Sequence, residues 1–132
     1  MNEKERTELI DAARQARANA VADFSNFKVG AALRTSSGKI VAGCNVENCT
    51  YGLTICAERV GLLTALAAGD REFTAVAVVT QSEKPSTPCG PCRQLMWEFC
   101  GDIPVFMVST KGRSATLRLS ELVPYAFDKR DL

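Results

Sequence analysis

The stretch CAERVGLLTALAAGDREFTAVAVVTQSEKPSTPCGPCRQLMWEF, residues 56–99, carries a helix, a buried strand and a second helix in succession. Residues 56–68 are apolar on nearly every face and are followed by Gly69, a residue that commonly ends helices. Residues 75–79 form a continuous apolar run, which is typical of a strand covered on both faces. After a polar loop with two prolines, residues 89–99 predict the next helix. This alternation indicates an α/β fold.

The flanking sequence supplies the remaining elements. Before the central stretch we expect a helix over 3–22 and a hairpin of strands 28–34 and 40–45 around a turn at 35–39. After it we expect strands at 105–109 and 116–119 and a short helix that begins at 120–122. The ordered part is expected to end at 124–127. A hairpin joined to strand–helix–strand units predicts a three-layer α/β/α sandwich with a mixed five-stranded sheet and helices on both faces.

Length and composition restrict the classes of protein. A chain of 132 residues is long enough for one domain with a real core, so we expect a single domain over residues 1–132. A net charge of +1 gives no electrostatic footprint for nucleic acid or an anionic membrane. No stretch approaches the ~20 apolar residues of a membrane span, and the polar start, residues 1–6, indicates no signal peptide. We expect a cytoplasmic protein that binds neither membranes nor nucleic acid.

The six cysteines and the absence of histidine define the available chemistry. Without a secretion signal, and with an adequate core, reduced thiols are a better interpretation than a disulfide framework. Because the chain has no histidine, catalysis by a histidine base or triad is excluded. Any zinc site must therefore use thiolates and carboxylates.

Two cysteine motifs predict such a site. Cys56 is followed two residues later by Glu58, and Cys89 and Cys92 form a Cys-x-x-Cys pair. Three thiolates leave one zinc position open, and an open position is what distinguishes catalytic from structural zinc. Both motifs stand at predicted helix starts, where exposed N–H groups and the helix dipole stabilise thiolates.

Two charged residues stand next to the first ligand. Glu58 is close to the metal by construction, so it can take a proton from a zinc-activated water and pass it to the substrate. Three thiolates outnumber the two positive charges of Zn²⁺, and this excess negative charge disfavours water activation. Arg59 is a candidate to offset it by donating to a ligand sulfur.

Two other interpretations of the cysteines stay open. Cys89 and Cys92 could be a thioredoxin-type redox pair, although this leaves Glu58 without a purpose. A closed structural zinc could take its fourth ligand from the remaining cysteines, which we instead interpret as small buried residues: Cys44, Cys49 and Cys100.

These motifs, together with others along the chain, resemble the small free-nucleoside type of cytidine deaminase. The matching blocks are FSNFKVGAA (24–32), GCNVEN (43–48), CAER (56–59), PCGPCRQ (88–94) and LVPYAF (122–127). The resemblance implies the cytidine deaminase fold, one Zn²⁺ per chain on Cys56, Cys89 and Cys92, and Glu58 as the catalytic proton shuttle.

The same resemblance implies how a nucleoside would bind. Asn45 and Glu47 would hydrogen-bond the ribose hydroxyls, Phe27 would pack against the pyrimidine, and the backbone of Ala57 would contact the base or the attacking water. Small members of this family are homotetramers whose sites borrow residues from neighbouring subunits, and Tyr51 and Phe127 match such positions.

The expected activity is zinc-dependent hydrolysis of the C–N bond of a cyclic amidine. Cytidine and 2′-deoxycytidine would give uridine and 2′-deoxyuridine with release of ammonia, as in pyrimidine salvage. The nearest rival is a blasticidin S deaminase, which shares the Cys-Ala-Glu and Pro-Cys-x-x-Cys blocks. A nucleic-acid deaminase is disfavoured by the near-neutral charge. The sequence leaves the preference between ribose and deoxyribose undecided.

Overall fold

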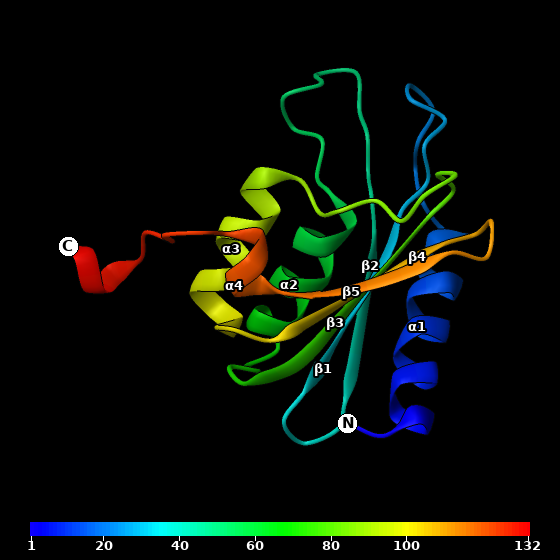
Figure 1. Cartoon of the computed structure of the whole chain (residues 1–132). Helices are drawn as coiled ribbons and strands as arrows, with labels where there is room; N and C mark the ends of the chain where they lie inside the picture. Colours follow the sequence, from blue (N-terminus) through cyan, green and yellow to red (C-terminus); the bar gives the residue numbers. More distant parts are fainter.

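The computed structural model describes all residues, 1–132, and contains the predicted elements in the predicted order (Figure 1). The elements are α1 (Glu3–Arg17), β1 (Gly30–Thr35), β2 (Ile40–Cys44), α2 (Ala57–Ala67), β3 (Phe73–Thr80), α3 (Gly90–Cys100), β4 (Pro104–Ser109), β5 (Ser114–Arg118), α4 (Leu119–Leu122) and the 3-10 turn η1 (Lys129–Asp131).

The five strands form one mixed sheet in the order β2-β1-β3-β4-β5. β1 pairs antiparallel with both β2 and β3, β3 runs parallel to β4, and β5 returns antiparallel beside β4. The parallel pair includes the central strand β3, and the connection between its two strands runs through α3, as a parallel crossover requires. The predicted mixed five-stranded sheet is confirmed.

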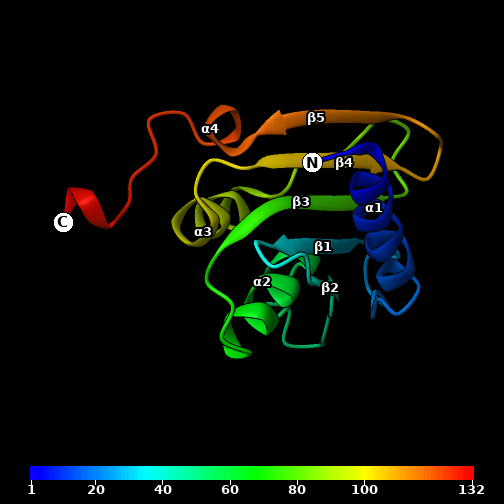
Figure 2. The same ribbon diagram turned by 90° about the horizontal axis from the view of Figure 1, so that it is seen from below.

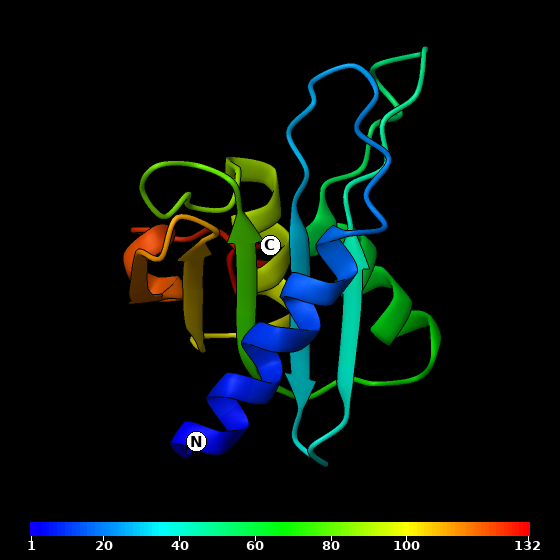
Figure 3. The same cartoon turned by 90° about the vertical axis from the view of Figure 1, so that its right-hand side faces the viewer.

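Helices cover both faces of the sheet. Figures 2 and 3 show α1 on one face and α2 and α3 on the other. Under α1, Leu9 and Ala13 pack against Ala32, Ala75 and other buried side chains of the central strands. A larger buried cluster lies between the other face and the helices α2 and α3. The predicted three-layer α/β/α sandwich is confirmed.

Helix α1 is shorter than the sequence predicted. It was expected to reach residue 22, but it ends at Arg17. The apolar residue Val21 is instead paired across the chain: its N–H donates to the Asn45 carbonyl, and its own carbonyl accepts from the Glu47 N–H. Tertiary pairing with the segment after β2 thus overrides the helical pattern of these residues.

The starts of α2 and α3 were predicted one residue too early, and the difference is informative. Cys56 and Cys89 are the N-cap residues of the two helices, with extended backbone angles, rather than their first helical residues. Pro91 occupies the first turn of α3, where a missing N–H costs nothing. Each cysteine therefore presents its sulfur at the end of a helix.

Two glycines allow α2 to lie unusually close to β2. A Cβ atom on Gly43 would be 2.4 Å from the Gly61 nitrogen and 2.8 Å from the Ala57 carbonyl oxygen. Only a residue without a side chain fits there, so the glycines fix the distance between the sheet and the helix that begins after Cys56.

The chain continues as regular structure beyond residue 127, where the ordered part was expected to end. Asp128 accepts from the Arg130 backbone and side chain and starts the turn η1. Figure 1 shows this C-terminal segment extending away from the sandwich. None of the helices combines the length and the apolar character needed to cross a membrane.

Candidate active site

The three predicted ligand cysteines come together. The sulfur atoms of Cys56, Cys89 and Cys92 all lie within 4.8 Å of one another. The distance from Cys56 Sγ to Cys89 Sγ is 3.6 Å, and that from Cys89 Sγ to Cys92 Sγ is 3.0 Å. Three convergent thiol groups on two helix starts fit Zn²⁺, which prefers sulfur ligands in such sites.

The other three cysteines stand outside this cluster. Cys44 and Cys100 are half-buried and Cys49 is exposed. The prediction that Cys49 is a small buried residue is wrong, because the loop that carries it extends from the body of the protein (Figure 1). A closed site with four cysteine ligands is therefore not favoured by the geometry.

A guanidinium group lies beside the first ligand. Arg59 Nη2 is 3.6 Å from Cys56 Sγ and 3.4 Å from the Thr54 carbonyl oxygen. Hydrogen bonds from the Cys92 thiol and from Arg59 lower the pKa of Cys56 to about 5, while the bond to Cys56 raises the pKa of Cys92. Arg59 therefore stabilises a thiolate at Cys56, which is the role the sequence suggested.

Glu58 lies in the first turn of α2, directly after the N-cap cysteine. Its side chain is 3% exposed, and it belongs to the lining of the cleft described below. Burial raises the pKa of the Glu58 carboxyl above its ordinary value. A buried carboxyl group facing a cleft beside three thiols is suited to accept and donate protons there.

A cleft of about 300 Å³ opens over these groups. Most of the predicted substrate-binding and catalytic residues line it, together with two ligand cysteines. They are Phe27, Asn45, Glu47, Ala57, Glu58, Cys56 and Cys89. The fold thus brings together residues that are separated by up to about half the chain, and the volume of the cleft is at the lower end of the range for small-molecule pockets.

The two predicted ribose-binding residues also organise the cleft itself. Asn45 Nδ2 donates to the Phe27 carbonyl at 2.8 Å, and Asn45 Oδ1 accepts from the Val29 N–H at 2.9 Å. Glu47 Oε1 accepts from the Phe24 and Ser25 N–H groups at 3.0 Å, and the Ser25 hydroxyl donates to Oε2. This hydroxyl lowers the pKa of Glu47. Both side chains therefore hold the loop that carries Phe27.

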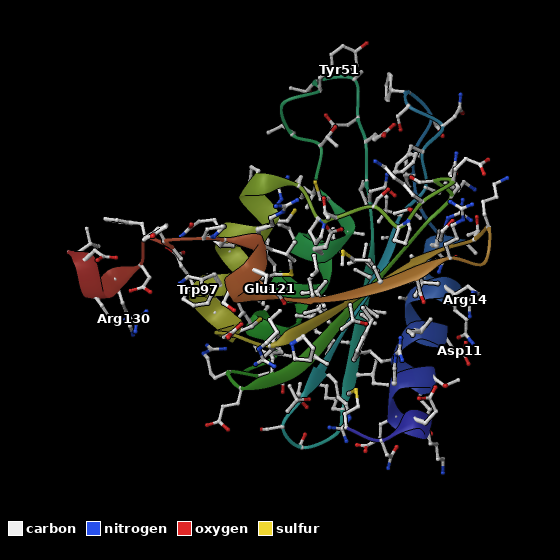
Figure 4. The ribbon with its side chains drawn as sticks, viewed as in Figure 1. Asp11, Arg14, Tyr51, Trp97, Glu121 and Arg130 are labelled. Atoms are coloured by element: carbon white, nitrogen blue, oxygen red, sulfur yellow. The ribbon has the colours of Figure 1, made fainter.

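Tyr51 and Phe127 do not reach the cleft of their own chain. Tyr51 is 69% exposed at the tip of the loop between β2 and α2 (Figure 4). Its ring meets the Phe24 ring edge-on, with 5.3 Å between the two ring centroids. Phe127 is 56% exposed in the C-terminal segment, and the Gln94 side chain donates to its carbonyl. Whether they complete a neighbouring site stays a prediction.

Several lining residues were not singled out from the sequence. They are Ser25, Val29, Thr54, Val78, Thr80, Ser86 and Thr87. A signal was available for part of this set, because Ser86 and Thr87 directly precede the Pro88-Cys89 motif. Small polar residues next to a ligand motif are candidates for the wall of the same site. Val78 gave no such signal, since it reads as an ordinary core residue of β3.

Comparison with known proteins agrees with this geometry. A family model described as the cytidine and deoxycytidylate deaminase zinc-binding region matches residues 3–108. A cytidine deaminase of Sporosarcina psychrophila is 45% identical, covering 94% of this chain and 92% of the relative. One of Halalkalibacterium halodurans is 43% identical, covering 97% and 98%. A crystal structure of cytidine deaminase from Burkholderia pseudomallei superposes with a TM-score of 0.90 at 47% identity, covering 96% of this chain and 100% of that one.

Proposed function

Because the chain belongs to the cytidine and deoxycytidylate deaminase family, we propose that it hydrolyses free cytidine and 2′-deoxycytidine to uridine and 2′-deoxyuridine with release of ammonia. Family membership makes it a zinc-dependent hydrolytic deaminase. The choice of nucleoside is the proposed part, and it rests on the lining of the cleft.

One observation carries this proposal: the buried carboxyl of Glu58 and three convergent thiols share a cleft with an aromatic ring and two hydrogen-bonding side chains. The ring of Phe27 offers a flat apolar contact for a pyrimidine. Asn45 and Glu47 offer polar atoms for sugar hydroxyls. A cleft of about 300 Å³ is at the small end of ligand pockets, which suits a nucleoside rather than a polymer.

Each residue has a role in this reaction. Cys56, Cys89 and Cys92 would hold Zn²⁺, which when bound lowers the pKa of water and so supplies the nucleophile. Glu58 accepts the proton of the attacking water and delivers it to ring N3 of the base. With the water oxygen now bonded to C4, Glu58 takes the proton of that hydroxyl group and gives it to the amino group, so that the C4–N bond breaks, ammonia leaves and the C4 carbonyl of uridine remains. Arg59 keeps Cys56 in the thiolate form through the contact with its sulfur.

The replacement Glu58→Gln tests the proposed role of the carboxyl group. We expect the variant to keep its zinc and fold and to lose about 10²- to 10⁴-fold in kcat, because the amide has the same shape but cannot shuttle protons. The measurement is the ultraviolet change on conversion of cytidine to uridine, run beside a zinc determination. Glu8→Ala is a matched control, since Glu8 is an exposed glutamate of α1.

The possible results distinguish an error in the proposed mechanism from an error in the proposed substrate. An active Glu58→Gln enzyme would contradict the proton shuttle. A zinc-loaded wild type that leaves cytidine and deoxycytidine unchanged would contradict the proposed substrates, and turnover of blasticidin S under the same conditions would identify the rival family member instead.

We also propose that the enzyme is a homotetramer that acts in the cytoplasm, in pyrimidine salvage. The exposure of Tyr51, Phe127 and Leu63 supports an assembly that covers them. Six free cysteines, three of them in the metal cluster, suit a reducing compartment. The molar mass of the zinc-loaded protein in solution tests the assembly, and a monomer at working concentration would contradict it.

A further inference from the structure

We propose that Gln81 and Arg17 are positioning residues that fix the Phe27 ring in the wall of the cleft. The inference rests on the proposed function, because it assigns the consequence of this positioning to pyrimidine binding. Neither residue lines the cleft, so any effect on the substrate must pass through the loop of residues 22–29.

The Gln81 side chain brackets Phe27. Its Nε2 donates to the carbonyl of Asn26, the residue before the ring, at 3.0 Å. Its Oε1 accepts from the N–H of Lys28, the residue after the ring, at 3.5 Å. One primary amide thus contacts the chain on both sides of Phe27, which uses both its donor and its acceptor capacity.

Arg17 completes the clamp from α1. Its Nη2 donates to Gln81 Oε1 at 2.7 Å, and its Nε donates to the Lys28 carbonyl at 2.9 Å. The charged donor orients the Gln81 amide, so that Nε2 points at Asn26. The two side chains and the loop form a connected set of four hydrogen bonds.

The loop needs such support, because its own backbone is irregular. Residues 26–29 belong to no helix or strand, and Asn26 has a φ of 56°, in the left-handed region that non-glycine residues rarely adopt. The N–H and carbonyl of Phe27 itself are held by Ser25 Oγ at 3.0 Å and Asn45 Nδ2 at 2.8 Å. With Gln81 and Arg17 holding its neighbours, the backbone angles of Phe27 are fixed from both directions.

A close contact between α1 and the sheet brings Arg17 to this place. A Cβ atom on Gly30 would be 1.9 Å from the Ala13 carbonyl oxygen and 2.6 Å from the Arg17 nitrogen. The last turn of α1 therefore lies directly on the start of β1, at the end of the sheet from which the loop emerges (Figure 3). Gln81 follows the last residue of β3, the strand that pairs with β1 there.

Steady-state kinetics of Gln81→Ala and Arg17→Ala test the proposal. We expect KM for cytidine to rise about 5- to 10-fold in each variant, which corresponds to the free energy of one or two lost hydrogen bonds. The kcat and the zinc content should stay within about twofold of the wild-type values. Gln81→Glu keeps the acceptor for Arg17 and loses the donor to Asn26, so its KM should lie between those of the wild type and Gln81→Ala. Gln15→Ala and Arg14→Ala, at exposed positions of α1, are the matched controls.

A double-mutant cycle with Phe27→Ala distinguishes positioning of the ring from a general effect on stability. If Gln81 acts through Phe27, then Gln81→Ala changes KM by less than about twofold once the ring is absent. A 5- to 10-fold rise in both backgrounds, or a fall in kcat with no change in KM, would overturn the proposal.

A second readout keeps this inference separate from the proposed function. If the wild-type enzyme does not turn over cytidine, the proposed substrate is wrong, and amide hydrogen exchange still decides the role of Gln81. We expect the amides of residues 27–29 to exchange about 5- to 10-fold faster in Gln81→Ala than in the wild type or Gln15→Ala. Unchanged exchange in this segment would overturn the positioning role for any ligand.

Discussion

The cleft has two walls that are held in place by different physics. The zinc wall consists of Cys56, Glu58 and Cys89, at the starts of α2 and α3, together with the buried Cys92, the third sulfur of the cluster. The loop wall consists of residues 24–29 with Asn45 and Glu47. The first wall stands on regular structure packed against the sheet. The second stands on irregular backbone that is held by side-chain hydrogen bonds.

The zinc wall owes its position mainly to packing. Ala57, Leu62 and Cys92 are buried in the larger core cluster, and the close contact between Gly43 and Gly61 fixes α2 against β2. Because both helices pack against the same sheet, this packing fixes the positions of all residues in their first turns. Neither N-cap cysteine makes a capping hydrogen bond, and the polar support of the helix starts comes from Arg59, which donates to the Thr54 carbonyl, and Arg93, which donates to the Pro88 carbonyl.

The loop wall needs a partner for each polar backbone group, because it has no ladder of its own. Ser25, Asn45, Glu47, Gln81 and Arg17 supply these partners. The groups proposed for the chemical step are thus placed mainly by many weak apolar contacts, whereas the groups proposed to recognise the substrate are placed by a few directional hydrogen bonds. Changes to the first wall should therefore affect zinc and kcat, and changes to the second should affect KM.

The largest expected effect comes from removing a ligand of the zinc wall. Cys89→Ser should weaken zinc binding by more than about 100-fold and should abolish turnover. Loss of a residue that only hydrogen-bonds a metal ligand already lowers metal affinity about 10- to 100-fold, and loss of the ligand itself should lower it further. Metal content after dialysis against a chelator measures this. Cys49→Ser, at the exposed cysteine, is the control and should keep both zinc and activity. Stoichiometric zinc in Cys89→Ser would show that the ligands are assigned wrongly.

An intermediate effect is expected from a methyl group at each of the two close helix contacts. In Gly43→Ala the added methyl group pushes α2 away from β2, and the displacement of Glu58 should lower kcat about 10- to 100-fold. In Gly30→Ala the added methyl group displaces Arg17, which should mainly raise KM. Each should cost about 1–3 kcal/mol of unfolding free energy, measured with urea. Gly52→Ala is the control, because a Cβ atom there would come no closer than 3.9 Å to the nearest atom beyond its two chain neighbours, the Thr50 carbonyl oxygen. The same kinetic change in both variants would contradict the division into two walls.

The smallest expected effect is that of Ser25→Ala in the loop wall. This change removes the hydroxyl that donates to Glu47 and accepts from the Phe27 N–H, so KM should rise about fivefold, the value of about 1 kcal/mol. The hydroxyl lowers the pKa of Glu47, so without it Glu47 protonates at a higher pH. On acidification, KM of the variant should therefore begin to rise at a higher pH than that of the wild type.

The matched control for this change is Ser114→Ala, at an exposed position of β5. It should leave KM unchanged at every pH. Identical pH profiles for the wild type and Ser25→Ala would show that the hydroxyl does not set the charge of Glu47.

The two walls also differ in how far sequence reasoning reached. The zinc wall was predicted residue by residue, because its motifs are local: Glu58 and Arg59 adjoin a ligand, and Cys92 is three residues from Cys89. In the loop wall, Phe27, Asn45 and Glu47 came from resemblance, while Ser25, Gln81 and Arg17 were missed. The contacts of Gln81 with Asn26 and Arg17 join residues 55 and 64 positions apart, and no local pattern marks them.

The sequence by itself determined the order of the elements, the mixed sheet and the ligand set, because apolar periodicity and cysteine spacing act over a few residues. Only the tertiary structure decided where α1 ends, since Val21 pairs with the segment after β2. It also decided that Cys56 and Cys89 cap their helices, and that Asn45 and Glu47 hold the loop they face. These features depend on contacts between distant segments, whose energies are comparable with local propensities and are settled only when the sheet is assembled.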